Sequence, residues 1–485
     1  GLGDVYKRQA SSCSEIVSRS SATGKKNTKT GNAVKSKISA ARLSAFKILQ
    51  KVFEGQSLTK AKQDVFEKLS DDRERGLANE IINGVLRWRW QLEFYVTMMV
   101  SKPLKQKDSA VQIVLLMALY ELTECRTPDY AIINQAVELV RKTGKKWAAS
   151  LVNALLRRFT REREKLQSSI TDDCARFSHP EWIIQKIKSD WSQDWQTILQ
   201  ANNQRPPFWL RVNRLHHTAE QYQKILEAED IGCERSKLTS QAVRLEQGTD
   251  VKRLPGYSDG AFSVQDVGAQ LTAELLSVSE GQVVLDMCAA PGGKTGHILE
   301  SCPSIAHLDV VELDAGRMRR VAENLHRLGF IDDSGHADNI EMIVADAGDH
   351  ESWWQGQLYD RILIDAPCSA SGVIRRHPDI KSLRHAADIP PLVAIQAKIL
   401  GSAWHMLKPG GEMLYVTCSL FSEENVVQMN NFLLTRQDAT EITIDSGWGV
   451  ACEHGRQLLP GQDDADGFYF CRIRKNPADK QSYSA

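Results

Sequence analysis

The sequence predicts a multidomain protein with an all-α N-terminal domain, a small α+β linker domain and a C-terminal α/β domain with a Rossmann-like sheet. Its 485 residues leave room for more than one hydrophobic core. Apolar residues recur every three or four positions from about residue 38 to residue 164, which predicts amphipathic helices. Beyond residue 282, apolar strand-like runs alternate with helical stretches, which indicates a mostly parallel sheet covered on both faces.

The composition is typical of a soluble globular protein, with 42% hydrophobic and 25% charged residues. No apolar run approaches the roughly 18 residues of a membrane span, so we expect no membrane partner. The ten cysteines include no CxxC pair, which disfavours a disulfide framework and a zinc site and predicts no metal. A reducing compartment, the cytoplasm, fits this pattern best.

The formal net charge is zero, but the basic residues are unevenly distributed. Residues 1–40 hold eight Lys or Arg against two acids, and residues 141–165 hold nine against two. Such clusters suit contact with an anionic polymer, although solvated surface faces have the same composition. We interpret residues 1–37 as a disordered basic leader, with an organellar transit peptide as the alternative.

Five helical stretches make up the expected N-terminal domain at residues 38–165. Gly or Pro falls between several of them, where helices usually end. The stretches are "ARLSAFKILQKVF", "RGLANEIINGVLRWRWQLEFYVTMM", "AVQIVLLMALYEL", "IINQAVELVRKTG" and "KWAASLVNALLRRFTRERE".

A linker and a small α+β subdomain are expected at residues 166–262, where "PFWLRVNR", "AVRLEQG" and "GAFSVQ" alternate like short strands. The α/β domain is expected at 263–475, followed by a flexible tail at 476–485. Its last run, "GFYFCRIRK", predicts a final antiparallel strand. The other strands are expected at 282–287, 308–313, 340–345, 360–366 and 412–417.

A glycine-rich turn follows the first of these strands, in "VVLDMCAAPGGKTGHILE". Glycines there let the backbone approach a ligand at the carboxyl end of a strand, where open α/β sheets bind ligands. The turn matches neither GxGxxG nor the P-loop pattern, so neither a dinucleotide nor a phosphate loop is favoured.

Acidic residues end four successive strands of this region. Glu312 comes twenty residues after Gly292, about where an acid accepts from ribose hydroxyls, and Asp346 is positioned to meet the adenine edge. A single acid at a strand end is usually a helix cap or a surface residue, but four in succession favour an adenosyl ligand. The pattern predicts S-adenosyl-L-methionine as the cofactor. The four acids are Asp286, Glu312, Asp346 and Asp365.

Two Cys-Ser pairs follow two of the strands, at Cys368 in "DAPCSA" and at Cys418 in "YVTCSL". The C5 carbon of a pyrimidine is a weak nucleophile, and a thiolate that adds to C6 makes it reactive. The thiol must afterwards be expelled, which needs a second group. A lone Cys after a strand is usually a packing residue, but two at adjacent strand ends fit attack by one and release by the other.

Several long motifs resemble the NOL1/NOP2/Sun family of RNA cytosine-C5 methyltransferases, and the helical region resembles the NusB-like domain of one bacterial branch. Over about residues 38–475 the chain resembles the members that methylate 16S ribosomal RNA of the small subunit. The C-terminal motifs are "DMCAAPGGKT", "DAPCSASGVIRRHPDIK", "YVTCSLFSEEN" and "LLPGQDDADGFYF". The N-terminal motifs are "LANEIINGVLR", "PDYAIINQAVELV" and "SLVNALLRR".

The resemblance implies a role for each matching residue. Cys418 would be the nucleophile that attacks C6, and Cys368 would help to expel it after methyl transfer. Asp365 or Lys294 would assist at the cytosine ring near N3, and the sequence does not separate the two. The family usually has Asp where Glu312 stands, so the reach of that ribose contact differs. The implied cofactor-binding residues are Cys288, Ala289, Ala290, Pro291, Gly292, Gly293, Lys294, Glu312, Asp346 and Asp365.

The resemblance also implies a NusB-like RNA-binding domain, an RNA-contacting small subdomain and a class I methyltransferase domain within the three ranges above. The partner would be 16S ribosomal RNA, naked or in a partly assembled small subunit, and the protein would be a monomer. Basic residues directly after Cys368 are expected to grip the phosphates beside a flipped-out base. They are Arg375, Arg376, His377 and Lys381.

Three alternatives share some of these features. A transfer-RNA cytosine-C5 methyltransferase would share the C-terminal half, and the NusB-like region argues against it only by analogy. A DNA enzyme is disfavoured by the "TCS" cysteine. A non-catalytic RNA-binding assembly or antitermination factor is disfavoured by the intact cysteines and the intact cofactor turn.

Overall fold

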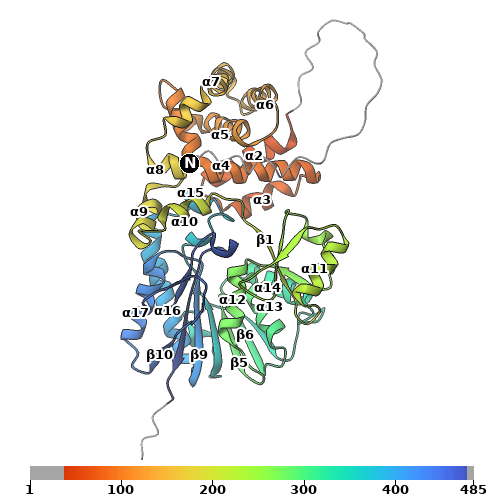
Figure 1. Ribbon diagram of the computed structural model, residues 1–485, viewed down its shortest axis with the longest axis vertical. Coiled ribbons are helices and arrows are strands. Elements are labelled where there is room, and N and C mark those ends of the chain that lie inside the picture. The colour runs from red at the N-terminus through yellow and green to blue at the C-terminus, as the bar shows by residue number, and fades with distance from the viewer. Residues whose placement is uncertain (1–37, 478–485) are drawn as a thin grey trace, which may run out of the picture. The chain divides into compact units, whose positions relative to one another are not determined.

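Figure 1 shows a computed structural model of the chain, in which residues 38–477 are described. The expected leader at 1–37 and residues 478–485 of the expected tail lie outside this range. Within it, helices come first, a small antiparallel sheet follows and a large mixed sheet ends the chain, which confirms the predicted fold class. Between residues 38 and 477, no helix has both the length and the apolar character needed to cross a membrane.

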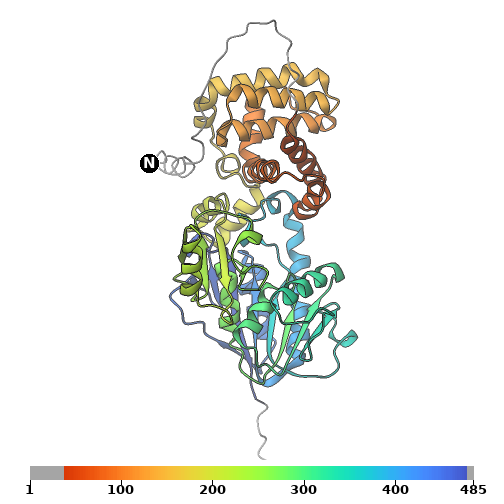
Figure 2. The same cartoon turned by 90° about the vertical axis from the view of Figure 1, so that its right-hand side faces the viewer.

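The helices up to Ser168 form one bundle, coloured dark red to yellow in Figure 2. The first three begin at residues whose side chains accept a hydrogen bond from the first turn, namely Ser39, Ser57 and Asp71. The bundle surrounds α5, which is buried on nearly all sides between Val111 and Leu122. The bounds are α2 (Ala40–Phe53), α3 (Leu58–Phe66), α4 (Asp72–Met99), α5 (Ser109–Glu124), α6 (Asp129–Lys142) and α7 (Ala149–Ser168).

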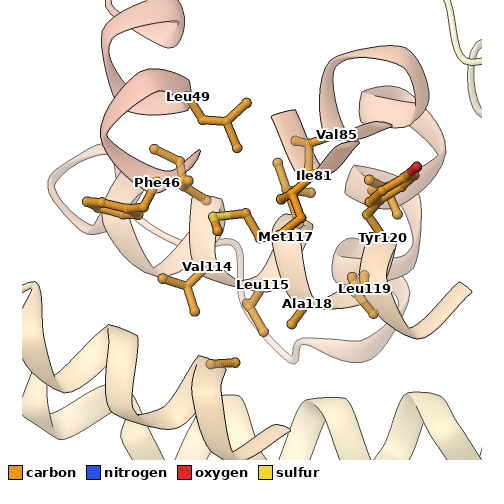
Figure 3. Packing of buried hydrophobic residues seen from close by; sticks show 14 of the residues in the cluster. Phe46, Leu49, Ile81, Val85, Val114, Leu115, Met117, Ala118, Leu119 and Tyr120 are labelled. Atoms are coloured by element: carbon orange, nitrogen blue, oxygen red, sulfur yellow. The ribbon is translucent and has the colours of Figure 1, made fainter. Parts of the chain in front are cut away.

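Helix α4 packs closely against α5 at a glycine. Figure 3 shows side chains of both helices, Ile81 and Val85 from α4 and Met117 and Tyr120 from α5, in one core. A Cβ atom at Gly84 would overlap the ring of Tyr120. Tyr120 is buried, and its hydroxyl donates to Glu80 Oε1, so the ring has little freedom to move aside. Gly84 is therefore required by the close approach of the two helices.

A second group of helices leads to the small sheet. All strands of this sheet are antiparallel, in the order β2-β3-β1-β4, and α11 begins with a capping box formed by Thr218 and Gln221. The helices are α8 (Asp173–Phe177), α9 (Glu181–Asp190), α10 (Trp195–Asn202) and α11 (Ala219–Ala228). The strands are β1 (Phe208–Val212), β2 (Cys233–Arg235), β3 (Ala242–Leu245) and β4 (Phe262–Val264).

The large sheet has the strand order β11-β12-β13-β9-β8-β5-β6-β7, and β10 pairs with β13. The five strands from β5 to β9 are mutually parallel, whereas β13 is antiparallel to β9, as predicted for the last strand. The strands are β5 (Val283–Met287), β6 (His307–Glu312), β7 (Ile340–Val344), β8 (Tyr359–Asp365), β9 (Leu407–Thr417), β10 (Ala439–Ile442), β11 (Val450–Ala451), β12 (Arg456–Leu458) and β13 (Phe468–Lys475).

Helices cover both faces of this sheet (Figure 1), and each face has its own core. Alternate residues of one strand serve the two cores: Val284 of β5 packs in one core and Leu285 in the other. One face is covered by α12 (Val267–Leu276), α13 (Gly293–Ser301) and α14 (Ala315–Arg327). The other is covered by α16 (Ile389–Met406) and α17 (Val426–Leu434).

We predict that Gly84→Ala destabilises the protein although alanine is the better helix former. Overpacking against Tyr120 costs about 1–3 kcal/mol, which exceeds the roughly 1 kcal/mol that alanine gains in a helix. Gly76→Ala is the matched control, because Gly76 lies in the same helix with nothing near its missing Cβ, and it should stabilise. Urea unfolding of the full chain measures both, and equal stabilisation by the two would contradict the packing argument.

Candidate active site

The predicted site residues lie at or just beyond the carboxyl ends of neighbouring parallel strands. In the sheet order β7-β6-β5-β8-β9, the strand order reverses between β5 and β8, and such a switch point is where open α/β sheets bind ligands. Along this edge lie, in order, Asp346 after β7, Glu312 at the end of β6, residues 288–294 after β5, Asp365 at the end of β8 with Cys368 after it, and Cys418 after β9.

The turn after β5 has a backbone that only small residues allow. Gly292 has φ of +89°, and a Cβ atom there would lie 3.1 Å from the Cα of Val321 on α14. Cys288 also lies in the left-handed region, with φ of +64°, a strained conformation of the kind that collects at functional sites. Helix α13 begins directly afterwards with no side-chain cap, which leaves its first backbone N–H groups without a capping partner from Gly292.

Glu312 is buried and braces this turn. Its Oε2 accepts from the N–H of Ala290 at 3.2 Å, and its Oε1 accepts from Arg317 Nη1 at 3.1 Å. Arg317 in turn donates to the carbonyl of Ala290 at 3.1 Å. The carboxylate therefore lies directly beside the turn, and its predicted contact with a ribose stays a prediction.

Lys294 and Asp365, which the sequence could not separate, form an ion pair with Nζ and Oδ2 2.6 Å apart. Burial alone would lower the pKa of Lys294, but attraction to Asp365 and to Cys418 raises it, so the side chain is a cation. Asp346 is half exposed, with Oδ1 accepting from the N–H of Gly348 and Oδ2 3.2 Å from Lys398 Nζ.

Asp286, the first of the strand-end acids, lies inside the sheet domain. It is fully buried, its Oδ2 accepts from the hydroxyl of Thr295 at 2.6 Å, and its Oδ1 has no hydrogen-bond partner among residues 38–477. Burial raises the pKa of Asp286 to about 7.

The two cysteines touch, with their Sγ atoms 3.5 Å apart. Cys368 is 8% exposed, whereas Cys418 is only partly buried. The hydrogen bond to Cys418, together with burial, raises the pKa of Cys368 well above its ordinary value. Burial therefore favours the neutral thiol at Cys368, whose sulfur touches the more accessible sulfur of Cys418.

Behind the two cysteines lies a buried carboxylate that the sequence analysis did not single out. Glu424 accepts hydrogen bonds from residues next to both cysteines, including the N–H of Ser369 and the hydroxyl of Ser419. The only sequence signal was the acidic pair in "SEEN", and nothing local distinguishes buried Glu424 from the more exposed Glu423.

The expectation that Arg375 and Lys381 grip RNA phosphates is wrong, because each is only 1% exposed. Lys381 Nζ donates to the carbonyls of Arg87 and Ser178 and to Asn203 Oδ1, at 2.6–2.9 Å. Arg375 and Arg376 both form ion pairs with Asp266 and Asp466. These ion pairs compensate for the cost of burying the guanidinium group of Arg375. His377 is exposed, so its RNA contact stays a prediction.

Family models match three successive parts of the chain. The model described as 16S rRNA methyltransferase RsmB/F matches residues 273–474. The NusB family model matches residues 39–161, and the model of an RsmF/B-like ferredoxin-like domain matches residues 179–252.

Two curated relatives cover most of the chain. Ribosomal RNA small subunit methyltransferase B of Pseudomonas putida is 41% identical over 441 residues, which are 90% of this chain and 99% of the relative. The protein of the same name from Vibrio cholerae is 41% identical over 404 residues, which are 83% of this chain and 90% of the relative.

Solved structures share the fold at lower identity. The protein PH0851 has a TM-score of 0.73 at 20% identity and covers 89% of this chain and 98% of its own. NSun6 from Pyrococcus horikoshii, solved with the S-adenosylmethionine analogue SFG, has a TM-score of 0.54 at 19% identity and covers 62% of this chain and 99% of its own.

We predict that Asp286 makes the protein less stable as the pH rises from 5 to 8. Between the ordinary carboxyl pKa near 4 and about 7, the folded protein holds a proton that the unfolded chain has lost, so stability falls through this window and is constant above it. Between pH 5 and 8 the loss amounts to about 3 kcal/mol. Asp286→Asn keeps an acceptor for Thr295 and should remove this loss. Urea unfolding at both pH values measures it, and an identical pH dependence in the variant would contradict the prediction.

Proposed function

Because the chain belongs to the RsmB/F family of 16S ribosomal RNA methyltransferases, we propose that it transfers a methyl group from S-adenosyl-L-methionine to C5 of a cytosine in 16S ribosomal RNA. The observation that carries the cytosine-C5 chemistry is the 3.5 Å contact between the sulfurs of Cys368 and Cys418. Two touching thiols beside a glycine-rich turn suit a reaction in which one sulfur bonds to the substrate and the other assists its departure.

The residues at the turn fit S-adenosyl-L-methionine, the cofactor of the family. A side chain at Gly292 would meet α14, the first amides of α13 have no side-chain cap, and the buried carboxylate of Glu312 lies beside the turn at Ala290. When bound, the cofactor supplies an electrophilic methyl group. The residues assigned to hold it are Cys288, Ala289, Ala290, Pro291, Gly292, Gly293, Lys294, Glu312, Asp346 and Asp365.

Cys418 is the nucleophile in this proposal, because it is the more accessible of the two sulfurs. Its thiolate adds to C6 of the cytosine, and the electron pair of the C5–C6 double bond then makes C5 reactive toward the methyl group. Two groups stabilise an anion at this sulfur: the thiol of Cys368, which donates a hydrogen bond, and the cation of Lys294.

Cys368 acts in the release step. When a base takes the C5 proton, the C5–C6 double bond forms again and the bond between C6 and Cys418 breaks. The departing sulfur regains the hydrogen bond from the Cys368 thiol, which lowers the cost of expelling it. Without Cys368 the adduct should form but leave slowly.

Lys294 and Asp365 act as a pair at the cytosine ring. Since Lys294 is a cation, it is the group that donates a hydrogen bond to the ring, and Asp365 holds its ammonium in position at 2.6 Å. A donor near N3 stabilises the negative charge that the ring gains when the thiolate adds.

Exposed basic residues on α7 extend the proposed RNA contact. Arg157, Arg161 and Lys165 are exposed, and a row of exposed cations suits sequence-independent contact with phosphates. The side chains of Arg158 and Arg163 instead form hydrogen bonds within the helical domain: Arg158 donates to the carbonyl of Met99, and Arg163 donates to the carbonyl of Leu122.

We predict that Cys368→Ala accumulates a covalent protein–RNA adduct and that Cys418→Ala forms none. The first variant keeps the nucleophile and loses the release group, whereas the second cannot attack C6. Each protein is incubated with S-adenosyl-L-methionine and unmodified 16S ribosomal RNA and then run on a denaturing gel.

Transfer RNA serves as the control substrate in this experiment. An adduct with Cys418→Ala but not with Cys368→Ala would mean that the two roles are exchanged. An adduct that forms only on transfer RNA would mean that transfer RNA, and not 16S ribosomal RNA, is the substrate. No adduct with either variant on either RNA would overturn the covalent mechanism and favour a non-catalytic binding factor.

A further inference from the structure

A single carboxylate joins the turns that carry the two cysteines. Glu424 Oε1 accepts from the N–H of Ser369 at 2.8 Å, and Glu424 Oε2 accepts from the hydroxyl of Ser419 at 2.5 Å. Ser369 follows Cys368 directly, and Ser419 follows Cys418 directly. The two oxygens of one side chain thus bind the residues adjacent to both sulfurs.

The hydroxyl groups of three serines form a second link between the same turns. Ser369 Oγ lies 3.0 Å from Ser419 Oγ, and Ser371 Oγ lies 3.2 Å from each of them. Ser371 Oγ also accepts from the N–H of Leu420 at 2.8 Å. All three serines are buried, so these contacts do not exchange with solvent.

Glu424 is itself fixed from two further elements. Gln396 on α16 donates to Glu424 Oε1 at 3.1 Å and to the carbonyl of Pro367, just before Cys368, at 2.9 Å. The hydroxyl of Tyr415 on β9 donates to the backbone carbonyl of Glu424 at 2.8 Å. The carboxylate is therefore held in one position relative to both strands.

The burial of Glu424 is costly in itself. The side chain is fully buried, and within residues 38–477 no Lys, Arg or His forms an ion pair with it. A buried carboxylate satisfied only by neutral donors contributes little net stability compared with an apolar side chain. Its position between the two cysteine turns therefore indicates a role at those turns and not in overall stability.

We propose that Glu424 is a positioning residue that holds the Cys368 and Cys418 turns together, so that release of the RNA adduct depends on it. This inference rests on the proposed function, in which release of the adduct requires the contact between the two sulfurs. Glu424 is the residue that we infer maintains this contact. Glu424 touches neither sulfur in the contacts described here and acts through Ser369 and Ser419.

The charge of Glu424 supports the same assignment. After the hydrogen bond to Cys418 and burial, the negative charge of Glu424 further raises the pKa of Cys368. The glutamate thus keeps Cys368 in the thiol form that donates to Cys418.

Glu424→Gln tests the proposal with little change in volume. The amide keeps one acceptor oxygen, but its NH2 group takes the place of the oxygen that now accepts either from the N–H groups of Ser369 and Gln396 or from the hydroxyl of Ser419, which weakens the link between the turns. We expect kcat to fall by about 10²-fold, the loss typical of a small displacement of reacting groups. We expect KM for RNA to stay unchanged and the covalent adduct to accumulate, as it should with Cys368→Ala.

A double variant separates positioning from a general structural role. If Glu424 acts through Cys368, Cys368→Ala with Glu424→Gln should be no slower than Cys368→Ala alone. Additive losses, or a loss of kcat in Glu424→Gln without adduct, would overturn the inference. Glu423→Gln is the matched control, because Glu423 is the neighbouring residue of the same type, pairs with Lys186 and contacts neither turn.

The outcomes also separate this inference from the proposed function. Adduct with Cys368→Ala but wild-type kinetics with Glu424→Gln would overturn only the role of Glu424. No adduct with Cys368→Ala would overturn the covalent mechanism and this inference with it. If Glu424→Gln does not fold, Ser419→Ala removes the hydroxyl that binds Glu424 and the other two serines and leaves the bond from Ser369 N–H to Glu424 in place. It should accumulate adduct to a smaller extent, and its failure to do so would overturn the inference.

Discussion

The parallel pairing of β8 with β9 is the interaction on which the candidate site depends. In this pair Asp365 lies opposite Val416, so the two strands end at the same level. The turns beyond them are joined at once, because the N–H of Gly372 donates to the carbonyl of Cys418 at 2.9 Å. A slip of one residue between the strands would separate the sulfurs and also exchange the side chains of the two cores. The burial of both sheet faces therefore fixes the register that the chemistry needs.

The segment after Cys368 connects this edge of the sheet to the helical domain. Helix α4 is kinked at Trp88, and the neighbouring carbonyl of Arg87 accepts from the buried ammonium of Lys381. Arg87 also donates to the carbonyl of Arg375, and Asp379 accepts from the N–H of Leu58 at the start of α3. The helical domain thus holds the segment that follows the Cys368 turn, at residues 375–381. These contacts are separate from the RNA contact proposed for α7.

The sequence predicted what depends on local pattern and missed what depends on distant partners. The parallel strands and the helices between them were predicted because apolar runs and glycine turns are local signals. Strands β10 to β12 were not, since each has at most four residues and pairs only with a neighbour or with β13. The roles of Arg375 and Glu424 were missed for the same reason: Asp466 lies 91 residues away from Arg375, and Ser369 lies 55 residues away from Glu424.

The proposed division of labour between the cysteines rests on their surroundings. Both are followed by serine, both come just after parallel strands, and their sulfurs are in contact, so neither motif by itself decides which one attacks. Cys368 is the more buried of the two and has the negative charge of Glu424 nearby, which favours the neutral thiol. Cys418 is more accessible and lies near the cation of Lys294, which suits it to the proposed role of nucleophile. When two identical titratable groups are held in contact, opposite environments are what give them opposite roles.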